Sequence, residues 1–279
     1  METKICLITG ANSGIGKASA IEIAKKGYQI VMICRNKQKA EAAQKEISQH
    51  TTFPVGLIIC DFASQESIRA AAAAYKKQYD RLDVLLNNAG FIAKSYAKTV
   101  DGIEQTFAVN HLGYFLLTNL LLNTLKNTPN ARVVNVASEA HRYTKFDINN
   151  LEMQKGYSHM KAYGLSKLCN IMFSRELSKR LKSTSVTSYS LHPGVVASNF
   201  STEMKGGFGF LFKMVKPFMV SNEKGAETSV FLATDPGVTQ FSGKYFAKKT
   251  IKKPVNDAVN DTLCKQLWEK SEEMTSLTN

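Results

Sequence analysis

Tyr163 and Lys167 are the two residues whose types and spacing most directly suggest chemistry. They stand four positions apart in Tyr163-Gly164-Leu165-Ser166-Lys167, and residues four apart lie on the same face of a helix. A tyrosine in water has a pKa of about 10, and a nearby ammonium group lowers that pKa because it stabilises the phenolate. The pair therefore predicts a tyrosine that donates or accepts a proton near neutral pH.

The same spacing also fits an ordinary amphipathic helix, in which the tyrosine is packed and the lysine is solvated. Leu165, Leu168 and Met172 recur at intervals of three and four, which predicts a long helix over residues 161–181 under either interpretation. The choice between packing and proton transfer depends on the elements that would bring other polar groups to this helix.

A glycine-rich loop follows the first apolar run of the chain. Lys4–Thr9 has the composition of a strand, Gly10, Gly14 and Gly16 come next, and an apolar helical pattern then continues to about Gly27. Glycines let the backbone approach a phosphate closely, and the free N–H groups at a helix start stabilise an anion. The loop therefore predicts a binding site for a dinucleotide pyrophosphate.

Further β-rich runs alternate with helical segments along the chain. Such continuously apolar runs are typical of a parallel sheet that is covered on both faces. We therefore predict one α/β domain over residues 1–279, a doubly wound parallel sheet with helices on both faces and ligands at the carboxyl ends of its strands. The predicted later strands are Tyr28–Cys34, Val55–Cys60, Val84–Asn87, Arg132–Ala137 and Val186–Leu191.

Taken together, these motifs resemble those of the classical short-chain dehydrogenases/reductases, a family with a Rossmann-type fold. The resemblance covers nearly the whole chain and is strongest to the retinol dehydrogenase-like branch, through the surroundings of Arg35 and the segments 243–246 and 267–271. The motifs are, in chain order, Thr9-Gly10-x-x-x-Gly14-Ile15-Gly16, Asn87-Asn88-Ala89-Gly90, Asn110, Ser138, Tyr163-x-x-x-Lys167 and His192-Pro193-Gly194.

The resemblance implies a catalytic tetrad. Tyr163 would be the general acid in carbonyl reduction and the general base in alcohol oxidation, and Ser138 would hydrogen-bond the substrate oxygen. Lys167 would bind the nicotinamide ribose and lower the tyrosine pKa. Asn110 would hold a water that connects the lysine with solvent. As isolated residues, Ser138 would more often cap a helix and Asn110 would be an ordinary helix residue.

The expected cofactor is NADP(H). No acidic residue occurs between Met32 and Ala40, where an NAD-binding protein usually has a carboxylate for the ribose hydroxyls, and Arg35 offers a guanidinium suited to a 2′-phosphate. Asp61 resembles the aspartate that accepts a hydrogen bond from the adenine amino group. The full implied cofactor set is Gly10, Asn12, Ser13, Gly14, Ile15, Gly16, Arg35, Asp61, Phe62, Asn87, Ala89, Gly90, Tyr163, Lys167, Pro193, Gly194 and Val196.

Composition excludes several other classes of protein. The net charge of +13 is dispersed, and the densest group, between Lys244 and Lys253, fits a solvated basic face better than a nucleic-acid or membrane surface, because no known recognition element accompanies it. A basic nucleic-acid-binding or membrane-associated protein remains a third hypothesis. The most membrane-like stretch, Leu112–Leu125, is interrupted by polar residues and predicts a buried helix rather than a span. Five cysteines without a CxxC pair and a start without a signal peptide predict a reduced, cytoplasmic protein. The five histidines lack metal-ligand spacing, so no metal is expected.

The substrate is expected to be a lipophilic aldehyde or ketone, or the corresponding alcohol, with carbonyl reduction favoured. Residues 195–220 combine large apolar side chains with three glycines, which predicts a substrate-binding lid; a packed helix pair, an oligomer contact or a peripheral membrane contact fits the same composition. Retinal, aliphatic aldehydes, sterol-like ketones and xenobiotic carbonyls all fit. The alternatives are an NADP(H)-sensing protein without turnover and a retinol- or steroid-type dehydrogenase working in the oxidative direction. The resemblance also allows a homo-oligomer through the helices at 110–125 and 161–181.

Overall fold

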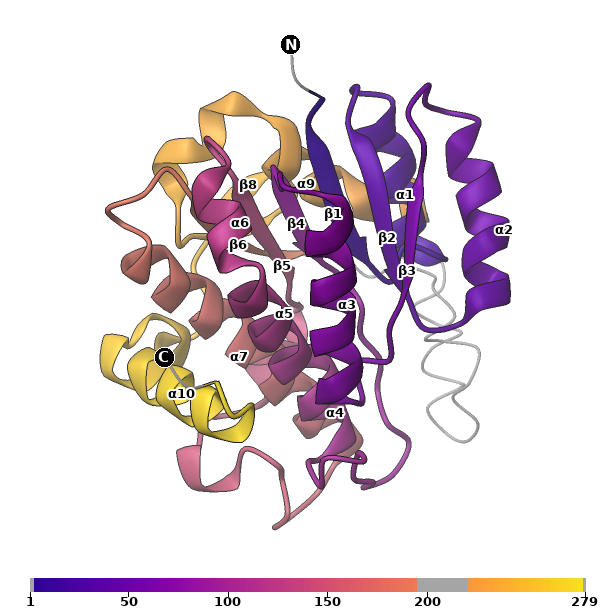
Figure 1. The fold of residues 1–279 in the computed structure, drawn as a ribbon. Coiled ribbons are helices and arrows are strands. Elements are labelled where there is room, and N and C mark those ends of the chain that lie inside the picture. Colours follow the sequence, from indigo (N-terminus) through magenta and orange to yellow (C-terminus); the bar gives the residue numbers. More distant parts are fainter. Residues whose placement is uncertain (1–2, 195–219, 278–279) are drawn as a thin grey trace.

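An eight-stranded sheet forms the centre of the computed structural model, which describes residues 3–194 and 220–277 (Figure 1). The strand order is β3-β2-β1-β4-β5-β6-β7-β8, and every neighbouring pair is parallel except β7 and β8. The order reverses between β1 and β4, which is where ligands bind in doubly wound sheets. The strands are β1 (Ile5–Thr9), β2 (Gln29–Cys34), β3 (Gly56–Ile59), β4 (Val84–Asn87), β5 (Arg132–Val136), β6 (Thr187–His192), β7 (Tyr245–Ala247) and β8 (Thr250–Lys252).

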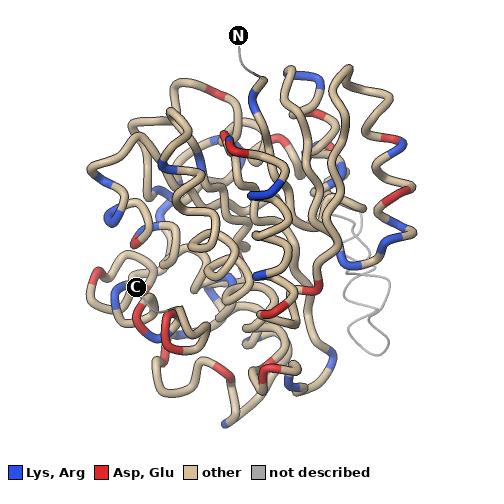
Figure 2. Tube along the Cα trace, in the orientation of Figure 1, with Lys and Arg blue, Asp and Glu red and all other residues tan. Residues whose placement is uncertain are grey.

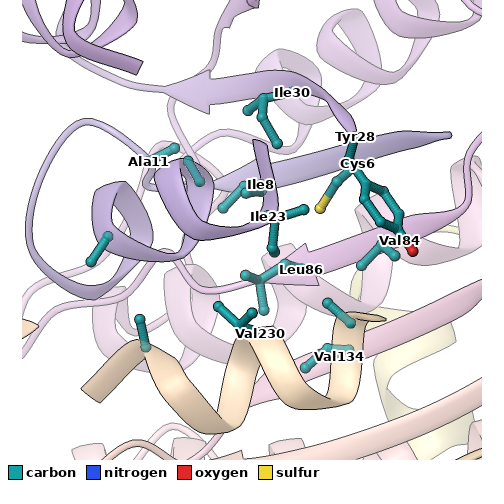
Figure 3. Close-up of a cluster of buried hydrophobic side chains, with 14 of the residues drawn as sticks. Cys6, Ile8, Ala11, Ile23, Tyr28, Ile30, Val84, Leu86, Val134 and Val230 are labelled. Atoms are coloured by element: carbon teal, nitrogen blue, oxygen red, sulfur yellow. The ribbon is translucent and has the colours of Figure 1, made fainter. Parts of the chain in front are cut away.

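Helices cover both faces of this sheet, as predicted. On one face, α1 (Gly14–Ala24), α2 (Lys37–Ser48) and α9 (Asn222–Thr234) bury apolar side chains against the strands, and Figure 3 shows part of this cluster, with Ile23 and Val230 on the helices. On the other face, α3 (Gln65–Gln78), α5 (Gly113–Leu120) and α7 (His159–Arg180) do the same. The terminal helix α10 (Asp261–Met274) packs against α7.

The first six predicted strands match the structure to within one residue at each end. The hairpin formed by β7 and β8 is the part of the described sheet that was not predicted. Its turn places Lys248 and Lys249 at positive φ, a conformation that normally favours glycine or asparagine, and Lys249 is held there by an ion pair with Glu227 of α9.

The stretch Leu112–Leu125 is helical and largely buried, as predicted, but it is divided between several helical elements, and Leu120 and Leu122 are only partly buried. The segment begins as a π-helical turn, η1 (Ala108–Leu112), continues as α5 and ends as a separate α6 (Leu122–Asn127). The break falls at Leu121, whose backbone angles, φ −101° and ψ 5°, are not helical. Asn119 Nδ2 donates to Phe115 O just before the break, a local bond of the kind that competes with helix continuation.

Helices in the described ranges are all too short or too polar to cross a membrane. Basic and acidic residues are interspersed along these parts of the chain (Figure 2), as the sequence indicated. The five cysteines are all buried with free thiols, and burial raises the pKa of Cys34 and Cys60 to about 11. They act as small apolar side chains.

Candidate active site

The glycine loop has the geometry of a phosphate cradle. Gly10 and Gly14 have φ angles of 69° and 56°, which few other residues adopt without strain. Helix α1 begins at Gly14, and the side chain of Ser13 before it makes no capping bond, so the N–H groups at the start of this helix remain available to an anion. The residues present therefore fit a dinucleotide pyrophosphate.

Gly16 allows the loop to close on itself. A Cβ atom added there would lie 2.3 Å from the carbonyl oxygen of Gly10 and 2.5 Å from Nδ2 of Asn88. Asn88 in turn donates through Nδ2 to the carbonyl oxygen of Thr9 at 2.9 Å. The close approach thus brings together the ends of β1 and β4.

Thr9, a residue that the sequence analysis did not assign to the site, joins the same two strands. Its fully buried hydroxyl oxygen accepts hydrogen bonds from the backbone N–H groups of Asn88 and Ala89, both at 2.9 Å. Tyr114 of α5 donates its hydroxyl to Ala89 O at 2.7 Å. A threonine directly before the first glycine was the only available signal for this role.

Ser138, Tyr163 and Lys167 come together as the sequence predicted. Ser138 follows β5, Tyr163 and Lys167 lie one turn apart on α7, and the Ser138 side chain hydrogen-bonds the phenol of Tyr163. Ser138 also caps the short turn η2 (Glu139–Tyr143) by accepting from Ala140 N at 3.2 Å. The hydroxyl is therefore held in place from the backbone side while it faces the phenol.

Lys167 is buried beside these groups without an acidic partner among the residues that the structure describes. Its Nζ donates to Val136 O at 3.0 Å and lies 5.6 Å from the ring centroids of both Tyr163 and Tyr114. The ammonium thus lies beside the tyrosine ring. Gly90 lies next to both Asn110 and Lys167, since a Cβ there would be 3.1 Å from Asn110 Oδ1 and 3.4 Å from Nζ.

The pKa of Tyr163 differs from the expectation. Burial raises the pKa of Tyr163 to about 12, and the hydrogen bond from Ser138 offsets only part of that effect. Burial also lowers the pKa of Lys167 to about 7. The predicted lowering by the lysine is not seen, because desolvation disfavours the charged forms of both side chains.

Asn110 lies in the π-helical turn η1 and is fully buried. Its side chain accepts from Phe91 N at 3.0 Å and donates to Phe91 O and to Ser166 Oγ at 2.9 and 3.1 Å. The side chain of Asn170 donates to the Asn110 carbonyl at 3.0 Å. Asn110 thus fixes the segment after Gly90 and links it to α7 through Ser166.

The residues expected at the adenosine end lie near the carboxyl ends of β2 and β3. Arg35 directly follows β2 and is exposed, and no described residue bonds its side chain. Asn36 beside it caps α2 by accepting from Lys39 N. Asp61 accepts from Ala63 N at 2.9 Å, whereas the cap of α3 is Ser64.

Two expected cofactor residues are core side chains in the structure. Asn87 is fully buried and donates to Thr118 and to Asn135 across the sheet. Phe62 packs against Gly113 of α5. Either residue could reach a cofactor only through its backbone.

The remaining expected residues divide between the cradle and the end of β6. Asn12 and Ile15 are half-buried within the glycine loop, and Pro193 and Gly194 follow β6, with Gly194 at φ 97°. Val196 and residues 195–219 of the expected lid lie outside the described residues. In the described part of the chain, no group of histidine, cysteine and acidic side chains has metal-binding geometry.

Comparisons with known proteins identify relatives of this chain. The model of the short chain dehydrogenase family matches residues 4–206. Retinol dehydrogenase 12 of Mus musculus is 42% identical over 275 residues, covering 98% of this chain and 87% of the relative. Retinol dehydrogenase 14 of Homo sapiens is 38% identical over 299 residues, covering 99% and 88%.

Solved structures share the fold. An uncharacterised protein from Mycobacterium Paratuberculosis superposes with a TM-score of 0.77 at 30% identity, covering 98% of this chain and 93% of the other. A variant of actinorhodin polyketide ketoreductase solved with NADPH gives a TM-score of 0.68 at 23% identity, covering 88% and 95%.

Proposed function

Because the chain belongs to the short-chain dehydrogenase family, we propose that it uses NADP(H) to interconvert a lipophilic aldehyde or ketone and its alcohol, with reduction favoured. Its family makes it an oxidoreductase that acts on CH–OH or C=O groups. The observation that carries the finer proposal is the hydrogen-bonded pair of Ser138 and Tyr163 with buried Lys167 beside it.

These side chains suit stabilisation of a developing alkoxide. Negative charge builds on the carbonyl oxygen as a carbonyl is reduced, and donors aimed at that oxygen stabilise the transition state. The Ser138 hydroxyl and the Tyr163 phenol are two such donors from different elements, and Tyr163 would pass its proton to the oxygen. When bound, NADPH would supply the hydride.

The pKa values support reduction as the favoured direction. Burial raises the pKa of Tyr163 to about 12, which favours the protonated phenol, the form that donates in reduction. Oxidation would need the phenolate, which desolvation disfavours. A charged Lys167 would stabilise the phenolate and so offset part of the desolvation cost of forming it.

The cofactor assignment rests on the glycine cradle and on Arg35. The cradle fits a pyrophosphate, and the exposed guanidinium after β2 has no described partner with which a 2′-phosphate would compete. By contrast, Lys17, a weaker candidate for the same phosphate, is already paired with Glu46 at 2.8 Å.

We expect Arg35→Asp to raise the dissociation constant for NADPH about 10–100-fold and to change that for NADH little. The physical reason is that a charge-assisted hydrogen bond to a phosphate contributes about 1.5–3 kcal/mol, and the new carboxylate would also repel it. Both constants can be measured by fluorescence titration. Lys45→Asp, the same charge change near the far end of α2, is the control, and an unchanged NADPH/NADH ratio in Arg35→Asp would contradict the assignment.

The substrate class is best tested by a screen. The relatives are retinol dehydrogenases, so retinal and retinol come first, followed by aliphatic aldehydes, sterol-like ketones and xenobiotic carbonyls. Each would be incubated with NADPH or NADH, or with the oxidised cofactor for alcohols, while the absorbance of the reduced cofactor is followed. Tight NADPH binding without turnover on any of them would favour a sensing role instead.

A further inference from the structure

Asn170 lies one helical turn beyond Lys167 on α7, and all its recorded bonds go to groups that support the candidate site. The residue is fully buried. Its Nδ2 donates to Asn110 O at 3.0 Å and to Val136 O at 3.3 Å, and its Oδ1 faces His111 Nδ1 at 3.4 Å. One amide therefore links α7, the π-helical turn and the end of β5.

The surroundings fix the orientation of this amide. If it were flipped, its oxygen would face two carbonyl oxygens, so Nδ2 must point toward Asn110 and Val136. His111 Nδ1 must then carry a hydrogen to donate to Oδ1. His111 Nε2 lies 3.0 Å from the hydroxyl oxygen of Ser271, which itself donates to Leu267 O at 2.7 Å. Burial lowers the pKa of His111 to about 3, which agrees with a neutral ring.

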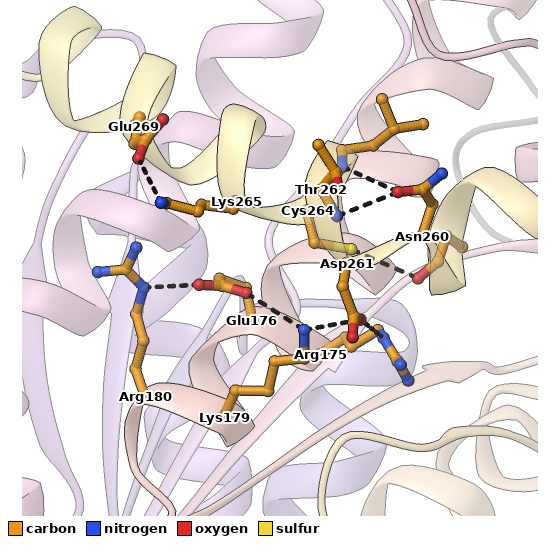
Figure 4. A network of polar contacts seen from close by, with 12 residues as sticks. Arg175, Glu176, Lys179, Arg180, Asn260, Asp261, Thr262, Cys264, Lys265 and Glu269 are labelled. Atoms are coloured by element: carbon orange, nitrogen blue, oxygen red, sulfur yellow. Dashed lines mark hydrogen bonds and ion pairs between the residues drawn. The ribbon is translucent and has the colours of Figure 1, made fainter.

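These buried contacts run from Asn170 through His111 to Ser271 on α10. The position of α10 is fixed by other contacts as well. Asp261 at the start of α10 forms ion pairs with Arg175 and Lys179 of α7 at 2.8 and 2.7 Å (Figure 4). Trp268 stacks on Phe173 of α7 with ring centroids 5.7 Å apart. These contacts hold α10, and with it Ser271, in place against α7.

Lys167 and Asn170 share one acceptor. Val136 O accepts from Lys167 Nζ at 3.0 Å and from Asn170 Nδ2 at 3.3 Å. With one lone pair taken by the amide, the ammonium is confined to the side of this oxygen that adjoins Tyr163 and Tyr114. The described titratable groups around Lys167 are these two phenols, with His111 beyond the amide.

We propose that Asn170 is a positioning residue, which fixes Lys167 Nζ beside Tyr163 and holds the π-helical turn that carries Asn110. This inference rests on the proposed function of Tyr163 and Lys167. It gives the Asn110 carbonyl a donor from the protein itself. It also makes the side chain at position 170 a determinant of the charge on Lys167, since Asn170 Nδ2 and Lys167 Nζ both donate to Val136 O.

Asn170→Asp tests the proposal, because it places a carboxylate next to Lys167. An opposite charge at such a distance raises the pKa of an amine, so Lys167 should stay charged to higher pH. We expect the rise in the NADPH dissociation constant with pH, which begins near the Lys167 pKa of about 7, to move upward by about one pH unit or more. Fluorescence titration between pH 6 and 10 measures this without turnover.

Asn170→Ser is the second variant, since a small hydroxyl is easily accommodated. It should lower kcat at least about tenfold, equivalent to ~1.4 kcal/mol, on the best aldehyde of the screen. Ser174→Ala is the matched control. Ser174 lies one turn further along the same face of α7, is fully buried and donates to Tyr189 O at 3.0 Å. The Ser174→Ala variant should therefore lose comparable thermal stability but keep the kcat of the wild type.

The proposal is overturned if the NADPH dissociation constant of Asn170→Asp begins to rise at the same pH as that of the wild type. If that variant does not fold, an Asn170→Ser kcat equal to that of Ser174→Ala overturns it. These results are distinct from failure of the proposed function, which would appear as undiminished turnover in Tyr163→Phe.

Discussion

Replacing Tyr163 by phenylalanine is expected to lower kcat by about 10²–10⁴-fold, the usual contribution of a positioned general acid. The change removes one oxygen and keeps the ring that lies beside Lys167. Ser138 would retain its cap on the η2 turn but would be the only remaining donor to the substrate oxygen. Because no group of the glycine cradle is touched, the NADPH dissociation constant should stay within about twofold of the wild type, or ~0.4 kcal/mol.

Tyr189→Phe is the matched control for this variant. Tyr189 is a fully buried residue of β6 whose hydroxyl donates to Val238 O at 3.1 Å. Its loss should cost about 1 kcal/mol of unfolding free energy and leave kcat unchanged. If Tyr163→Phe kept substantial turnover with intact NADPH binding, Tyr163 would not be the proton donor.

Gly16→Ala is expected to weaken dinucleotide binding by on the order of 100-fold, or ~2.8 kcal/mol. The new methyl group would lie 2.3 Å from Gly10 O and 2.5 Å from Asn88 Nδ2. The first of these atoms is backbone, so the loop itself must move and the cradle must open. Overpacking of this kind also costs about 1–3 kcal/mol of stability, which thermal denaturation would detect alongside calorimetric titration with NADPH.

The control for this prediction is at the other end of α1. Gly27 follows that helix with φ 83° and has no atom within 4 Å of an added Cβ, so Gly27→Asn introduces a residue that tolerates the backbone angle into open space. It should bind NADPH normally. Near-normal binding by Gly16→Ala would mean that the cradle is less rigid than the contacts imply.

Much of the fold was predictable because the central strands are buried on both faces. Ile30, Val31 and Met32 of β2, for example, form an uninterrupted apolar run, and such runs mark parallel strands. The hairpin of β7 and β8 escaped prediction because each strand has three residues and β8 is exposed throughout. The break at Leu121 escaped because the apolar pattern continues across it.

The identity and order of the candidate site residues could also be predicted, but not their electrostatics. Tyr163 and Lys167 were correctly placed on one helix face, whereas the rise in the pKa of Tyr163 depends on desolvation by surrounding elements. Thr9 and Asn170 were missed for a related reason. Their roles arise from hydrogen bonds to residues far along the chain, and a single polar residue in an apolar segment gives no sign of its partner.

The Thr9 hydroxyl, which accepts two N–H groups from the segment after β4, has a consequence for the lifetime of the protein. The cradle exists only when β1 and β4 are paired, so a dinucleotide would bind the folded chain and not the unfolded one. Ligand present at a hundred times its dissociation constant then adds about 2.7 kcal/mol to the unfolding free energy. Resistance to proteolysis should accordingly rise with the concentration of the dinucleotide that the cradle binds.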